Sequence, residues 1–137
     1  MPSRIAATVA VAGIAGAAVR WGVAAQIDDN WALLIVNVVG CGIVGWATAR
    51  HERIRLDRRS QPRSPSVVGS DAGPSPWLTA GFCGALTSMS ALALQLARYL
   101  DDGRIGTAGA WLGLTIAACT AAFVGSRTAV LAYWRRA

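Results

Sequence analysis

The chain has 137 residues and a formal net charge of +6, yet only 15% of its residues are charged and 54% are hydrophobic. This composition excludes a disordered chain, which needs low hydrophobicity, and the length fits one domain. A soluble nucleic-acid binder spreads basic residues over a water-facing surface, whereas these arginines gather between apolar runs, so no nucleic-acid partner is expected. A high net charge on so few charged residues is typical of a membrane protein whose arginines mark one side.

Four apolar segments each approach the roughly 20 residues that a membrane-spanning helix needs. They cover approximately residues 5–26, 31–49, 77–98 and 105–126. Each is apolar around its whole circumference, unlike the one-sided stripe of a soluble amphipathic helix. We therefore expect an all-α membrane protein with four transmembrane helices in a single domain, in contact with membrane lipid.

The connections between these segments differ in length. Residues 28–30 and 101–104 form short turns, whereas residues 51–76 begin with HERIRLDRRSQPR and continue through Ser, Gly and Pro. We expect 51–76 to be a flexible, Arg-rich loop without a core of its own.

Arginine is distributed unequally over the two sides that four spans define. The side with both termini and the 51–76 loop carries nine arginines, and the side with the short turns carries two, Arg98 and Arg104. The nine are Arg4, Arg50, Arg53, Arg55, Arg58, Arg59, Arg63, Arg135 and Arg136. Because cytoplasmic segments are enriched in arginine, both termini and the middle loop are predicted to be cytoplasmic.

Two polar side chains inside the first two spans need partners. Arg20 lies near the outer end of its helix, where it either snorkels to the interface or bonds to backbone. Asn37 lies in the middle of the second span, where an unpaired amide costs roughly a few kcal/mol. A hydrogen bond between helices and a pore-lining role are both open for Asn37.

The third span contains the run GFCGALTSMS at residues 81–90, with two glycines and three hydroxyls in the middle of the membrane. Glycine weakens a helix, and hydroxyls re-satisfy freed carbonyls. We expect a helix broken mid-membrane, whose carbonyls attract cations and whose inner N-terminus attracts anions. The alternative is an unbroken helix with hydroxyls bonded to its own carbonyls.

The reactive residues do not form a catalytic set. Cys41, Cys83 and Cys119 lie in separate apolar runs without a CxxC spacing, so we interpret them as small packing residues rather than a disulfide or zinc site. His51 is the only histidine, and all seven acidic residues lie in loops or connections. This favours transport or structure over enzymatic catalysis.

Four short stretches occur in order along the spans. They are Gly16-Ala-Ala-Val-Arg20, Asn37-Val-Val-Gly40, GFCGALTSMS at 81–90 and Asp102-Gly-Arg104. Together they resemble the Fluc (CrcB-type) fluoride channel family over nearly the whole chain, and the third stretch resembles the family pattern GFCGGLTTFS. The resemblance implies a subunit of an antiparallel dimer in the bacterial inner membrane that exports fluoride passively from the cytoplasm and protects against its toxicity.

The resemblance also implies site residues. A structural Na⁺ at the dimer interface would be held by the backbone carbonyls of Gly84 and Thr87, and Arg20 matches a structural arginine of the first helix. The implied fluoride path comprises Asn37, Thr87, Ser88, Met89, Ser90, Leu92, Trp111, Thr115 and Cys119. Amides and hydroxyls on this path would replace the water around a strongly hydrated anion.

Met89 and Leu92 depart from the family pattern, because they stand where the family has its two pore phenylalanines. In addition, an antiparallel homodimer needs one sequence to insert both ways, which a strong arginine bias disfavours. We therefore hypothesise an antiparallel heterodimer with an oppositely oriented paralogue that supplies the phenylalanines, with a homodimer as the alternative. Two other functions stay open: a small multidrug-type four-helix transporter, and a degenerate non-conducting subunit of a fluoride channel heterodimer.

Overall fold

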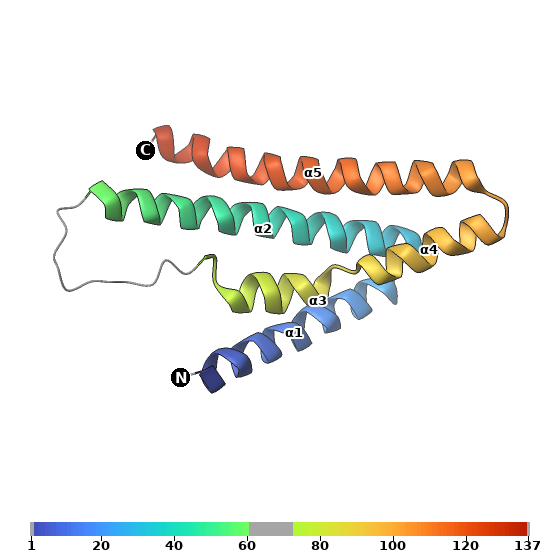
Figure 1. The fold of residues 1–137 in the computed structure, drawn as a ribbon, viewed down its shortest axis with the longest axis horizontal. Coiled ribbons are helices and arrows are strands. Elements are labelled where there is room, and N and C mark those ends of the chain that lie inside the picture. The colour runs from blue at the N-terminus through green and yellow to red at the C-terminus, as the bar shows by residue number, and fades with distance from the viewer. Residues whose placement is uncertain (1, 61–72, 137) are drawn as a thin grey trace.

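The computed structural model describes residues 2–60 and 73–136, and these residues form helices and short connections without a strand. The elements are α1 (Pro2–Ala24), α2 (Asp29–Ser60), the π-helical segment η1 (Trp77–Cys83), α3 (Gly84–Leu86), α4 (Met89–Asp101) and α5 (Ile105–Arg136). η1, α3 and α4 follow one another as the third traverse of the molecule (Figure 1).

The described helices include four spans long and apolar enough to cross a membrane: Ser3–Ala24, Asp29–Leu56, Trp77–Asp101 and Ile105–Arg135. They run alternately back and forth, so α2 and α5 are parallel to each other (Figure 1). Both chain termini, the end of α2 and the start of η1 lie at one end of the bundle (Figure 1). The predicted all-α fold with four transmembrane helices is confirmed.

α2 and α5 are the longest elements, with 32 residues each. At a rise of about 1.5 Å per residue each is about 48 Å long, which exceeds the roughly 30 Å of the hydrocarbon core. If the first turns of α2 and α5 lie at one surface of the membrane, their last turns therefore extend beyond the hydrocarbon core at the other surface.

The helical extension of α2 corrects one expectation, because residues 51–60 were predicted to belong to the flexible loop. This stretch, HERIRLDRRS, consists largely of residues with high helix propensity and contains neither Gly nor Pro, so the helix continues to Ser60. Arg127 Nη2 on α5 donates to Glu52 Oε2 at 2.8 Å, and the Arg53 guanidinium lies 5.3 Å from the centre of the Trp134 ring. Residues 61–72 of the predicted loop lie outside the described residues.

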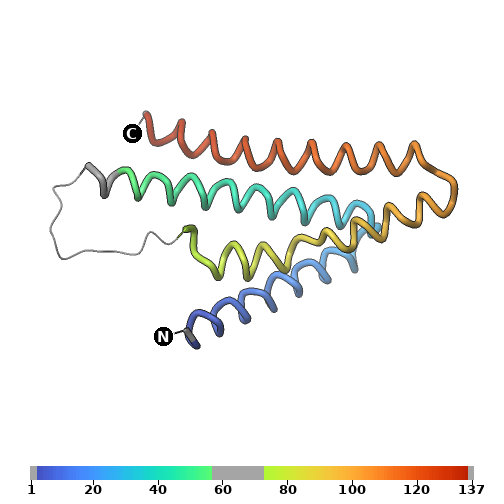
Figure 2. The backbone as a smooth tube through the Cα atoms, viewed as in Figure 1, coloured from blue at the N-terminus to red at the C-terminus, as the bar shows by residue number. Residues whose placement is uncertain are grey.

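Small residues set the distances between the helices. α1 packs against η1 and α3, and α2 packs along α5 (Figure 2). A Cβ added to Gly16 on α1 would overlap the Phe82 carbonyl oxygen, and one on Gly45 of α2 would overlap the Phe123 carbonyl oxygen of α5. Glycine at these two positions therefore lets backbones approach one another, as helix packing in lipid favours.

Substitution of Gly16 by Ala is expected to destabilise the protein, because the added methyl group would force α1 away from Phe82. Overpacking of this kind costs about 1–3 kcal/mol. Gly22→Ala on the same helix is the matched control, because nothing lies within 4 Å of its added Cβ. Both substitutions gain the same helix propensity, so the difference between their melting temperatures in detergent measures the overlap. Equal melting temperatures would contradict this packing.

Candidate functional site

The third traverse is interrupted between α3 and α4. Thr87 (φ −81°, ψ 152°) and Ser88 (φ −147°, ψ 104°) are both extended, whereas the residues on either side are helical. The Thr87 hydroxyl does donate to the Cys83 carbonyl at 3.0 Å. This bond closes the last turn of the first half of the helix and does not continue the helix past Thr87. The predicted break is confirmed, and the unbroken alternative is wrong.

Asn37 on α2 holds the break. Its Oδ1 accepts a hydrogen bond from the backbone N–H of Ser88 at 2.9 Å, and the side chain is 5% exposed. In a continuous helix the Ser88 N–H would donate to the Gly84 carbonyl instead. The buried amide of Asn37 therefore has its partner on a neighbouring span, as one of the two sequence alternatives proposed.

The first residues of α4 are also satisfied locally. Ser88 is the N-cap, and its hydroxyl oxygen accepts from the Ala91 N–H at 3.2 Å. The hydroxyls of Ser88 and Ser90 lie 3.3 Å apart. α4 thus begins inside the span with a capped N-terminus, where the helix dipole presents partial positive charge.

α5 faces α2 through a row of residues spaced by four. Trp111, Thr115 and Cys119 share one face of the helix. Thr115 is 6% exposed, and its hydroxyl donates to the Trp111 carbonyl at 2.9 Å. The Trp111 ring meets Trp31 of α2 edge to face, with ring centres 5.2 Å apart. Asn37 on α2 and Thr115 on α5 are both buried polar residues of these two parallel helices.

Met89 and Leu92, the two positions at which the resemblance implies phenylalanine in the family, differ in environment. Met89 is 76% exposed and projects from the chain, whereas Leu92 is 3% exposed and packs inside it. Ser90 is exposed and Ser88 is buried. A ligand or second chain that approaches the break therefore meets Met89 and Ser90 before it meets Leu92.

A hollow of about 580 Å³ lies at the end of the bundle opposite the chain termini. Arg20, Arg98 and Gln95 help to line it. The Gln95 amide donates to Asn30 Oδ1 on α2, a contact that sequence reasoning did not anticipate. Gln95 and Asn30 are too far apart in the sequence for any local pattern to link them.

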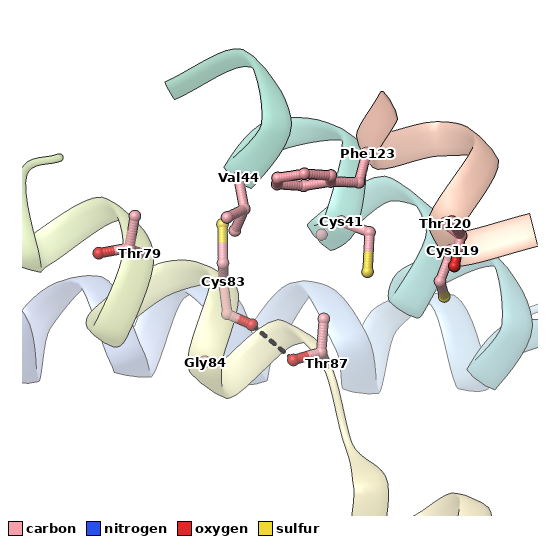
Figure 3. Close-up of a pocket in the computed structure, with 10 residues that line it drawn as sticks. Cys41, Val44, Thr79, Cys83, Gly84, Thr87, Cys119, Thr120 and Phe123 are labelled. Carbon is pink, nitrogen blue, oxygen red and sulfur yellow. Dashed lines mark hydrogen bonds between the residues drawn. The ribbon is translucent and has the colours of Figure 1, made fainter. Parts of the chain in front are cut away.

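The break opens onto a cavity of about 390 Å³ between α2, η1, α3 and α5 (Figure 3). Gly84 and Thr87 line it, and so do Cys41, Cys83 and Cys119. The three cysteines come from different helices. The sequence holds one signal for the approach of two of them, a spacing of four that places Cys41 one turn after Asn37 and Cys119 one turn after Thr115.

The oxygen atoms at the break suit a cation. The described residues contain no group of three His, Cys, Asp or Glu side chains able to hold a metal ion. The Gly84 carbonyl, however, loses the helical partner that Asn37 takes, and Gly84 and Thr87 both line the cavity. Carbonyls at the end of a half-helix are typical Na⁺ ligands, so the residues present fit the expected ion.

Comparison with known proteins finds similarity along most of the chain. A family model described as CrcB-like protein, Camphor Resistance (CrcB), matches residues 7–126. A protein of Stutzerimonas stutzeri named Fluoride-specific ion channel FluC is 32% identical over 116 residues, which cover 80% of this chain and 83% of that protein. A protein of Natronomonas pharaonis named Fluoride-specific ion channel FluC 2 is 33% identical over 108 residues, covering 69% and 93% respectively.

Substitution of Asn37 by Ala should expose the Ser88 N–H to exchange, because nothing else in the described structure accepts its hydrogen bond. A buried donor left without its partner costs about 1–3 kcal/mol. We expect hydrogen–deuterium exchange of a peptide covering residues 84–91 to accelerate by roughly tenfold or more, the equivalent of about 1.4 kcal/mol.

Thr115→Val is the control for this measurement, because the Thr115 hydroxyl bonds only within its own helix and valine has nearly the same shape. The control should leave exchange at 84–91 close to that of the unaltered protein. Unchanged exchange in Asn37→Ala would show that Asn37 does not hold the break.

Proposed function

The chain belongs to the CrcB-like (Camphor Resistance) family, and from this membership we propose that it is a subunit of a fluoride-specific ion channel. The channel lets F⁻ leave the cytoplasm passively and has no enzymatic activity. The observation that carries the proposal is the match over residues 7–126, which covers most of the first and fourth spans, all of the second span and the whole interrupted third traverse.

Asn37 is proposed as the central pore residue because of how its amide is oriented. Its Oδ1 is already occupied by the Ser88 N–H. The remaining atom, Nδ2, carries two N–H donors that have no partner among the described residues. Donors of this kind, held in a buried position, are what a dehydrating anion needs.

The other proposed pore residues extend this polar region. Thr87, Ser88, Ser90 and Thr115 supply hydroxyls, and the N-terminus of α4 supplies partial positive charge within the membrane. Met89, Leu92, Trp111 and Cys119 are proposed as the apolar and weakly polar walls. The Thr87 and Thr115 hydroxyls donate to the carbonyls of Cys83 and Trp111, so each would exchange that bond for one to the passing anion.

A structural Na⁺ is proposed at the carbonyls of Gly84 and Thr87. The freed Gly84 carbonyl and the cavity beside it support this assignment. When bound, the ion supplies positive charge that compensates the partial negative charge of these oxygens where two subunits meet.

Removal of sodium should therefore weaken the assembly. We expect the melting temperature of the purified protein to fall when Na⁺ in the buffer is replaced by a bulky organic cation, and to recover when Na⁺ returns. K⁺ in place of Na⁺ tests the size preference. A melting temperature independent of Na⁺ would contradict the assigned ion.

The dimer is proposed to be an antiparallel heterodimer, with both termini of this chain cytoplasmic in the bacterial inner membrane. In its most apolar stretch, the α1 span is only 6% buried inside the chain, and the α5 span only 11%. Lipid or a second chain must therefore cover these two stretches. The excess of arginine at one end supports a single orientation. Relatives named FluC 2 are compatible with paired family members.

The alternative functions are less well supported. A proton-coupled multidrug-type transporter normally needs a carboxylate inside the membrane, and residues 5–26, 31–49, 77–98 and 105–126 contain no Asp or Glu. A non-conducting subunit is not favoured by relatives that are named as channels.

Fluoride efflux from liposomes tests the proposal. We expect slow or no efflux with this chain alone, and fast, fluoride-selective efflux with an oppositely oriented paralogue. Asn37→Ala in this chain should reduce efflux at least tenfold, because a lost hydrogen bond to an ion costs about 1.5–3 kcal/mol. Thr8→Val, which removes an exposed hydroxyl bonded within α1, is the control.

Two outcomes would contradict parts of this proposal. No efflux in either preparation, despite folded protein, would refute the channel function. Fast efflux by this chain alone, together with reporters fused to its C-terminus that read both orientations, would replace the heterodimer with a homodimer.

A further inference from the structure

We propose that Cys41 and Cys119 form a two-coordinate binding site for a soft, thiophilic metal cation of the Hg(II), Ag(I) or Cu(I) class. The site lies between α2 and α5, inside the membrane-spanning part of the bundle. It concerns metal binding and does not depend on the proposed ion conduction.

The two thiols lie on facing helices. Cys41 on α2 and Cys119 on α5 are free cysteines that both line the cavity at the break. They extend from two facing helices into the same cavity of about 390 Å³ (Figure 3). Both side chains are only partly buried, so an ion entering the cavity can reach either sulfur.

The seam between α2 and α5 keeps the pair together. Because the two helices are parallel, residues spaced by four on each helix stay opposite one another along the seam. Asn37 and Thr115 lie one turn before the thiols, and Gly45 meets the Phe123 backbone one turn after them. The close approach at Gly45 allows little separation of the helices, and this keeps the two cysteines opposite one another.

The composition of the site selects the class of metal. Thiolate sulfur is a soft ligand that prefers soft cations. Structural zinc takes four ligands in a tetrahedron, and the described residues contain no group of even three suitable side chains. Two sulfurs without a third ligand suit ions that accept two ligands in a line. Cys83 lines the same cavity but is 2% exposed and lies on η1, so it serves as an internal control.

Binding is a ligand exchange without electron transfer. Each thiol releases its proton to water, and each sulfur forms one bond to the metal. For Hg(II), two S–Hg bonds form, two S–H bonds break and two protons are released. The oxidation states of sulfur and metal do not change, so no oxidant or reductant is needed.

The test uses the full-length protein in detergent, free of reductant and oxygen, with one equivalent of Hg(II) and an equal concentration of a small monothiol competitor. We expect intact mass spectrometry to show one Hg per chain with the loss of two protons. Alkylation after denaturation, followed by peptide mapping, should find Cys83 alkylated and Cys41 and Cys119 protected.

Substitutions distinguish the role of Cys41 and Cys119 from that of Cys83. Cys83→Ala should bind Hg(II) as the unaltered protein does. Cys41→Ser and Cys119→Ser should each weaken Hg(II) binding strongly. The loss should exceed the roughly 10–100-fold caused by removing a residue that only supports a metal ligand. Protection of Cys83, loss of binding in Cys83→Ala, undiminished binding in either serine variant, or no retained Hg(II) would each overturn the proposal. If a serine variant does not fold, the peptide map of the unaltered protein decides.

Discussion

The membrane interior contains no water that could satisfy a broken helix, and the bond from the Ser88 N–H to Asn37 Oδ1 meets this constraint. Without it, the interruption at Thr87 and Ser88 would leave a buried donor unpaired. With it, α4 can begin in the middle of a span, and the Gly84 carbonyl is released from helical bonding. Gly40, one turn after Asn37, completes the arrangement, because a Cβ there would overlap the Thr87 methyl group. One asparagine and one glycine on α2 thus determine the shape of the third traverse.

The parallel packing of α2 and α5 is the second constraint. Residues at a spacing of four on both helices form successive pairs across the seam, and Asn37, Cys41 and Gly45 take part on the α2 side. Beyond the apolar region the same two helices are joined by Glu52 with Arg127 and by Arg53 with Trp134. These polar contacts lie at the surface, where an ion pair contributes little stability, so the register of α2 against α5 depends mainly on the tight contact at Gly45.

Sequence reasoning predicted the parts of the fold that depend on composition and local chemistry. Four apolar runs specify four spans, and two glycines with three hydroxyls in 81–90 specify a weak point in the third. The need of Asn37 for a partner followed from its position, but the identity of that partner did not. Ser88 lies 51 residues further along the chain, and only packing brings its N–H to Asn37. The convergence of the three cysteines escaped prediction for the same reason. Residues 51–60 were assigned to a loop because charge suggested solvent exposure, yet a solvated helix is equally compatible with charge.

The length of α2 and α5 has an electrostatic consequence. If the first turns of α2 and α5 lie at the opposite surface, about 18 Å of each helix lies outside the hydrocarbon core at the arginine-rich end, in the headgroup region and the water beyond it. Charges in water are screened over about 8 Å at physiological ionic strength. Arg50, packed over the Trp46 ring near the base of this extension, therefore acts on the potential at the membrane surface. The extension enriches anions beside the bundle only within a shallow layer, and added salt removes that enrichment.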